Sequence, residues 1–86
     1  MKVYILTVDQ VYNDEIFENS YPKAYSTMEK AKKAFNAFVD EERENVQRDG
    51  WVEAEENSDT HYEAWEDGNY ISNHTDARII EATLDE

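Results

Sequence analysis

Hydrophobic positions are almost continuous at the start of the chain. The segment KVYILTV, residues 2–8, is rich in β-branched and aromatic side chains and is nearly apolar on both of its faces. This pattern is typical of a central strand. An Asn-Asp pair at 13–14 supplies turn chemistry, and EIF at 15–17 predicts a return strand. Pro22 cannot donate to a ladder, so the return strand is expected to be interrupted there and to resume at 23–26.

The middle of the chain carries apolar residues at helical spacing. Ser26 and Glu29 match the S-x-x-E capping box, in which each side chain bonds a backbone N–H at the other end of the first turn. An Asp-Gly pair at 49–50 is a typical helix end, because glycine adopts the left-handed conformation freely. These signals predict a helix over about residues 27–48. Its apolar stripe consists of Met28, Ala31, Phe35, Phe38, Val39 and Val46.

The pattern after residue 50 changes to the alternation of strands. WVEAE at 51–55 and HYEAWE at 61–66 both alternate, with turn residues between them. An Asp-Gly pair at 67–68 predicts a hairpin in which NYIS at 69–72 returns beside the preceding strand. The segment ARIIEATL at 77–84 predicts a final strand.

This order of elements predicts an α+β fold. The simplest packing is one antiparallel β-sheet with a single long amphipathic helix on one face, in one domain over residues 1–86. A chain of this length has no room for a second core. Glu53, Glu55 and Glu63 are then expected to project from the solvent face of the sheet.

Charge is distributed unevenly along the chain. The net charge is −13, yet residues 1–39 contain five acidic residues and five lysines and are neutral. Residues 40–86 contain sixteen acidic residues against three arginines and no lysine. The acidic half begins at the C-terminal end of the predicted helix, where the helix dipole favours cations. Local stability therefore offers no reason for these acids, and chance combined with solubility is the simplest alternative to a functional one.

Composition excludes several classes of protein. The chain has no cysteine, so it has neither disulfides nor thiolate metal sites. It has no apolar run long enough for a membrane span and no leader pattern. A cytoplasmic location is the expectation that follows.

Three segments carry a resemblance to a known group. KVYILTV at the start, AYSTMEKAKKAF at 24–35 and IIEATLDE at 79–86 resemble small uncharacterised proteins of phages and other mobile elements. In that group a short hairpin leads through an ST-x-EKA helix start to a last strand with an acidic tail. The resemblance covers about a third of the chain and implies a fold, with no catalytic residues to transfer. The acidic, aromatic segment 50–76 departs from the group, so any specific activity is expected there.

Histidine and acid pairs are the best candidates for chemistry. Asp59-x-His61 and His74-x-Asp76 would converge on a divalent metal ion if their strands were neighbours. The simpler interpretation is two exposed histidines in polar turns. The chain has no Gly-rich phosphate loop and no marked nucleophile, and its many carboxylates make no pair diagnostic. The sequence therefore predicts no enzyme, no cofactor and no metal.

The charge distribution points to a basic protein as partner. Direct nucleic-acid binding requires a basic surface, and Lys30, Lys32 and Lys33 alone make a small one. Carboxylates at i and i+3 or i+4 on a helix lie about 5–6 Å apart, which is similar to neighbouring phosphates on a nucleic-acid strand. An acidic row of this kind would occupy the nucleic-acid-binding groove of a host protein.

The hypothesis is thus a phage-type inhibitor that mimics nucleic acid and acts on a host defence protein, of the anti-CRISPR or anti-restriction type. The aromatic residues within the acidic segment 50–76 would serve as desolvated anchors, because charge contributes more to association rate than to affinity. The predicted partner-binding residues are Asp40, Glu41, Glu42, Glu44, Asp49, Glu53, Glu55, Glu56, Glu63, Trp65, Glu66, Asp67 and Tyr70. The alternative is an acidic adaptor or structural subunit that binds a protein through the aromatic segment 51–70.

Overall fold

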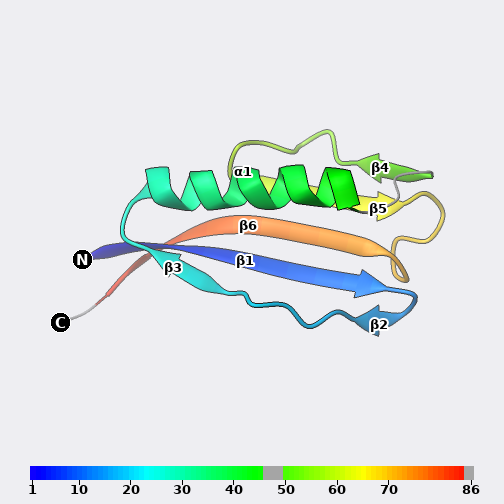
Figure 1. Ribbon diagram of the computed structural model, residues 1–86, viewed down its shortest axis with the longest axis horizontal. Coiled ribbons are helices and arrows are strands. Elements are labelled where there is room, and N and C mark those ends of the chain that lie inside the picture. The colour runs from blue at the N-terminus through cyan, green and yellow to red at the C-terminus, as the bar shows by residue number, and fades with distance from the viewer. Residues whose placement is uncertain (46–49, 85–86) are drawn as a thin grey trace.

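The computed structural model describes residues 1–45 and 50–84, and there it shows one antiparallel sheet with one helix on one face (Figure 1). The predicted α+β fold is therefore confirmed. The elements are β1 (Lys2–Tyr12), β2 (Glu15–Ile16), β3 (Lys23–Tyr25), α1 (Met28–Asn45), β4 (Trp51–Glu53), β5 (His61–Glu66) and β6 (His74–Thr83).

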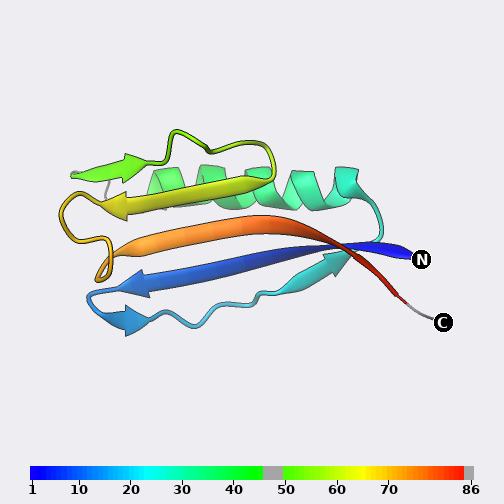
Figure 2. The same cartoon turned by 180° about the vertical axis from the view of Figure 1, so that it is seen from behind.

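The two longest strands form the centre of the sheet. The strand order is β2-β1-β6-β5-β4, and β3 also pairs with β1. Figure 2 shows this arrangement from the face that α1 leaves open. β1 and β6 pair along their length, from Lys2 opposite Thr83 to Val11 opposite His74. β1 therefore has paired neighbours along both of its edges, as the prediction of a central strand requires.

The start of the chain folds as its turn signals predict. Asn13 and Asp14 both have positive φ, at 52° and 67°, which is the backbone of a type I′ hairpin turn. Asn and Asp tolerate this left-handed conformation better than other non-glycine residues. The return strand is indeed broken around Pro22, since β2 ends at residue 16 and β3 begins at residue 23.

The helix starts one residue later than the predicted capping box requires. Thr27, rather than Ser26, is the N-cap, because its Oγ1 accepts the backbone N–H of Lys30 at 3.1 Å. Ser26 accepts a bond from the Lys30 ammonium instead, at 3.4 Å. Glu29 consequently stands one position too early to complete the box. The predicted helix end, with Val46 and Asp49, lies outside the described residues.

The core lies between α1 and the sheet. Ala31, Phe35, Phe38 and Val39 of the predicted stripe are all buried, and Met28 is half-buried. They pack against side chains from three neighbouring strands: Leu6, Val8, Tyr62, Ala64 and Ala77. Alternation along β5 therefore directs residues 62 and 64 to the helix and residues 61, 63 and 65 to the open face.

Two expectations for the second half of the chain were wrong. Residues 69–72 form turns rather than a strand, because the Asn69 and Ser72 amides bond to nearby carbonyls instead of to a ladder. The strand that returns beside β5 is β6. Glu53 points to the helix side of the sheet, opposite buried Ala64, and Glu55 lies beyond the end of β4.

Phe35 tests whether the helix stripe holds the fold together. Its side chain is 2% exposed in the centre of the core. Phe35→Ala is expected to lower the free energy of unfolding by about 3 kcal/mol or more, because it leaves a cavity. Asn36→Ala, at the exposed neighbouring position, should change it by less than about 0.5 kcal/mol. Urea denaturation followed by circular dichroism measures both, and equal effects would contradict this packing.

Candidate protein-binding surface and histidine–carboxylate cluster

The last described turns of α1 expose three unpaired carboxylates. Asp40, Glu41 and Glu44 are exposed, and none of them forms an ion pair with a described residue. Their i, i+3 and i, i+4 spacing places the side chains about 5–6 Å apart. Arg43 lies among them, and its guanidinium holds Glu53 through bonds of 2.9 and 3.0 Å. The bond to Glu53 raises the pKa of Arg43, and the Asp40 charge acts in the same direction without forming an ion pair. We call Asp40, Glu41 and Glu44 the acidic helix end.

Glu42 does not belong to this exposed row, although the sequence placed it there. Its side chain is half-buried between the helix and the sheet. The Oε1 atom accepts bonds from Gln10 Nε2 at 2.9 Å, Tyr12 OH at 2.8 Å and Thr75 Oγ1 at 3.3 Å. Burial raises the pKa of Tyr12 to about 12, and the neighbouring Glu42 charge acts in the same direction. The helix periodicity explains the difference, since residue 42 follows Phe38 and Val39 on the inner face.

The loop between β4 and β5 adds two exposed acids beside the helix. Glu55 and Glu56 are exposed on this loop. An ion pair of 3.0 Å between Lys32 and Asp59 fixes the loop to α1, and Figure 1 shows the loop running along the helix. Glu53 is neutralised by Arg43 and also accepts a bond from the Tyr62 hydroxyl at 2.8 Å.

The remaining predicted residues lie on other parts of the surface. Glu63 and Trp65 alternate onto the open face of the sheet, opposite α1. Glu66 and Asp67 lie at the end of β5, where Glu66 accepts a bond from Asn69 at 2.7 Å. Asp49 lies outside the described residues. The residues of the predicted acidic row therefore lie on two separate surfaces, because strand alternation places Glu63 on the face away from the helix.

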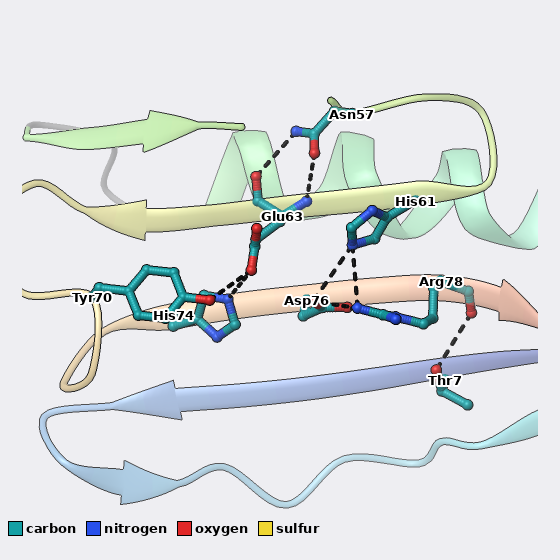
Figure 3. A network of polar contacts seen from close by, with 8 residues as sticks. All are labelled: Thr7, Asn57, His61, Glu63, Tyr70, His74, Asp76 and Arg78. Carbon is teal, nitrogen blue, oxygen red and sulfur yellow. Dashed lines mark hydrogen bonds and ion pairs between the residues drawn. The ribbon is translucent and has the colours of Figure 1, made fainter. Parts of the chain in front are cut away.

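The open face carries a cluster of polar side chains around two carboxylates (Figure 3). His74 Nε2 lies 2.8 Å from Glu63 Oε2, and the Tyr70 hydroxyl donates to the same oxygen at 2.7 Å. The second carboxylate, Asp76, accepts two bonds from the Arg78 guanidinium, at 3.2 Å to Oδ1 and 2.9 Å to Oδ2. His61 Nε2 lies 3.5 Å from Asp76 Oδ2.

The register of two strands assembles this cluster. β5 pairs with β6 so that Glu63 is opposite Asp76 and His61 is opposite Arg78. The two histidines thus lie on neighbouring strands, which was the condition for a shared site. One of the two predicted acids is different, however. Asp59 forms an ion pair with Lys32, and Glu63 stands in the cluster where Asp59 was predicted. Alternation within HYEAWE places Glu63 on the same face as His61, and this signal was available in the sequence.

Hydrogen bonds keep both carboxylates charged. Burial alone would raise the pKa of Glu63, but the bonds from Tyr70 and His74 outweigh burial and lower the pKa. Burial likewise opposes ionisation of Asp76, and the Arg78 guanidinium with a smaller contribution from His61 lowers its pKa below the usual range. The bond to Glu63 raises the pKa of the Tyr70 hydroxyl.

Three side chains of this cluster have the geometry of metal ligands. One ligand atom each from Glu63, His74 and Asp76 lies within 4.8 Å of the others. One nitrogen and two oxygens form a donor set that Zn²⁺ or a similar divalent ion accepts. The same atoms already have partners, because Arg78 bonds both oxygens of Asp76, while Tyr70 and His74 bond Glu63. The cluster is therefore satisfied by its own side chains.

Comparisons with protein-family models, with curated proteins and with solved structures find no match to this chain. Among the described residues, no helix is both long enough and apolar enough to cross a membrane, since α1 is rich in charged side chains.

The cluster predicts an acid-dependent loss of stability. The pKa values of Glu63 and Asp76 are lower in the folded protein than in the unfolded chain, so ionised carboxylates favour folding. This stability is present at neutral pH and is lost below about pH 5, as protons bind more strongly to the unfolded chain. Glu63→Gln should flatten the pH dependence of urea unfolding between pH 7 and pH 3. Glu56→Gln, at an exposed loop position, is the control, and identical profiles would contradict the prediction.

A chelator tests whether the cluster needs an ion. Because Arg78, Tyr70 and His74 already bond the two carboxylates, EDTA is expected to leave the melting temperature unchanged. Thermal unfolding of the protein, as purified and after dialysis against EDTA, measures this. A drop of several degrees that zinc reverses would instead assign Glu63, His74 and Asp76 as ligands.

Proposed function

We propose that this protein is a non-enzymatic inhibitor that binds the nucleic-acid-binding surface of a host defence protein, in the cytoplasm of the host cell. The observation that carries the proposal is the acidic helix end, where three exposed carboxylates form no ion pair with the described residues. The partner is a basic protein, and the inhibitor is of the anti-CRISPR or anti-restriction type.

The ion pairs that basic side chains form elsewhere in the molecule support this proposal. Lys2, Lys32, Arg43 and Arg78 each form an ion pair with a carboxylate away from the helix end. The acids at the helix end are instead at the negative pole of the helix dipole, where each costs a few tenths of a kcal/mol. An acidic surface that forms no ion pair within the described residues and does not help folding is well suited to a basic partner.

The spacing of these acids supports mimicry of nucleic acid in particular. Glu44 lies about 5–6 Å from Glu41 and from Asp40, at i, i+3 and i, i+4 spacing, a separation similar to that of phosphates along a strand. Glu55 and Glu56 extend the charge along the adjoining loop. The resemblance to phage and mobile-element proteins supports a defence protein as the target, by analogy.

One observation favours the alternative, an acidic adaptor. Trp65 and Tyr70 stack edge to face on the open side of the sheet, with ring centroids 5.4 Å apart. Tyr70 is 47% exposed, and Val52, which pairs with Trp65, is 38% exposed. Aromatic groups of this kind are frequent anchors of protein interfaces. An adaptor would lose its partner on Tyr70→Ala and keep it when the acidic helix end is reversed.

Charge reversal at the helix end tests the proposal. Asp40→Lys with Glu44→Lys removes two exposed acids and leaves half-buried Glu42 in place. The double variant should fold normally and capture the partner from host lysate at least about tenfold less well than the wild-type protein, because charge complementarity is lost. Nucleic acid should compete with the wild-type protein for the same captured protein. Raising the salt concentration from about 0.05 to 0.3 M should weaken capture further.

Glu29→Lys with Glu81→Lys is the matched control, since both residues are exposed, both lie away from the helix end, and the total charge changes equally. This control should capture the partner almost as well as the wild-type protein. The proposal fails if the helix-end variant captures the partner normally, or if nucleic acid does not compete.

A further inference from the structure

A cavity of about 440 Å³ lies next to the acidic helix end. It is formed where the second half of α1 faces the end of β1 and the segment between β2 and β3, which runs along the edge of the sheet (Figure 1). Its walls include four aromatic rings and two carboxylates. These residues are Tyr12, Phe17, Tyr21, Phe38, Glu41 and Glu42.

The aromatic rings of the cavity stand in two edge-to-face pairs. Tyr12 and Phe17 have ring centroids 5.6 Å apart and planes at 82°, and Tyr21 and Phe38 have centroids 5.9 Å apart and planes at 81°. The faces of such rings are electron-rich and attract cations. Lys23, which does not line the cavity, already places its ammonium 5.1 Å from the centroid of the Tyr21 ring.

The two carboxylates of the cavity can still accept bonds from a ligand. All three hydrogen bonds to Glu42 reach its Oε1 atom, and within residues 1–45 and 50–84 no group donates to Oε2. Glu41 lines the same cavity and has no ion-pair partner in this part of the chain. The three bonds satisfy one oxygen of Glu42, whereas the half-buried Oε2 atom has lost hydration without a donor in this part of the chain, so a cation at Oε2 would be favourable.

We propose that this cavity binds an arginine side chain of the basic partner; the inference rests on the proposed function and names the group that is recognised. A guanidinium is planar, so it stacks on aromatic rings while its N–H groups donate to carboxylates. Glu42 Oε2 and Glu41 provide the acceptors, and the rings around them provide stacking surfaces. A lysine ammonium would use these groups less fully, because it is a strongly hydrated point charge.

Such a site provides a desolvated contact, which the exposed acids do not provide. Surface charge accelerates association and selects the sign of the partner, whereas affinity depends on a few groups that are desolvated in a pocket. The sequence predicts this role for Trp65 and Tyr70, but these residues lie on the open side of the sheet, opposite α1 and the cavity. The cavity places an anchor directly beside Asp40, Glu41 and Glu44, so both parts contact one partner surface.

A titration with a neutral analogue tests the site in the intact protein. The ¹⁵N-labelled full-length chain is titrated with Nα-acetyl-arginine N-methylamide and with the corresponding citrulline compound, which has the same shape and no charge. The arginine compound should shift the backbone amides of Ser20, Phe38 and Glu42 in a saturable manner. The citrulline compound should bind at least about tenfold more weakly, because it lacks the charge-assisted bonds and the cation–π contact. The lysine compound should be intermediate.

Two glutamine variants on the same helix distinguish binding in the cavity from nonspecific attraction by the negative charge of the helix. Glu42→Gln retains an oxygen for Gln10, Tyr12 and Thr75, so the protein should fold, and it should weaken arginine binding about tenfold. Glu44→Gln changes the net charge equally at an exposed position outside the cavity and should weaken binding less than about twofold. Phe17→Leu, at a 53% exposed ring, should also weaken binding without unfolding the chain.

Three results would overturn the inference: equal binding of arginine and citrulline compounds, equal effects of Glu42→Gln and Glu44→Gln, or tighter binding of the lysine compound. These failures differ from failure of the proposed function. Asp40 and Glu44, which the charge-reversal experiment changes, do not line the cavity, so partner capture and arginine binding are measured on separate residues.

Discussion

The pairing of β1 with β6 is the interaction on which the rest of the structure depends. It joins residues 2–11 to residues 74–83, nearly the full length of the chain apart. Closing so long a loop has an entropic cost, which a two-stranded ribbon alone does not recover. The pair becomes stable when α1 covers one face with Phe35, Phe38 and Val39, and when β5 extends the sheet. The helix, the edge strands and every polar cluster take their positions from these two strands.

One consequence is that neighbouring residues of β6 direct carboxylate contacts to opposite faces of the sheet. Thr75 and Asp76 are neighbours in β6 and therefore face opposite sides of the sheet. Thr75 donates to Glu42 beneath the helix, whereas Asp76 pairs with Arg78 on the open face. Four carboxylates, of Glu42, Glu53, Glu63 and Asp76, are bonded to hydroxyl, imidazole or guanidinium groups.

The acids at the end of α1 differ from these because they form no ion pair with any residue that the structure describes. Asp40, Glu41 and Glu44 are exposed, while Arg43 between them turns toward Glu53. Their repulsion is small when solvated, so folding tolerates them. The adjoining cavity combines aromatic rings with the unused oxygen of Glu42. Exposed charge and a partly desolvated anchor on one side of a small domain together support the proposal of a basic protein partner.

The sequence by itself determined the elements with strong local signals. The 3.6-residue spacing of Ala31, Phe35 and Phe38 identified the helix and its buried face, and the Asn-Asp turn and Pro22 marked the limits of the return strand. These features depend on residues close in the chain, so their patterns are visible without a structure. The choice of Thr27 as N-cap shows the limit, since two adjacent hydroxyl residues both satisfy the pattern.

Only the tertiary structure decided which side chains meet. Alternation indicates that residues 61, 63 and 65 share a face, but the register with β6 decides that Glu63 contacts His74 and that Asp59 does not. Four of the five residues at 40–44 are acidic and look equivalent in the sequence, yet the packing of α1 over β1 turns Glu42 alone toward Tyr12. The strand at 69–72 failed for the same reason, since local propensity was adequate and β6 occupied the edge of β5. Contacts between distant segments depend on register and on which neighbour completes the sheet, and neither is encoded in any short stretch of the chain.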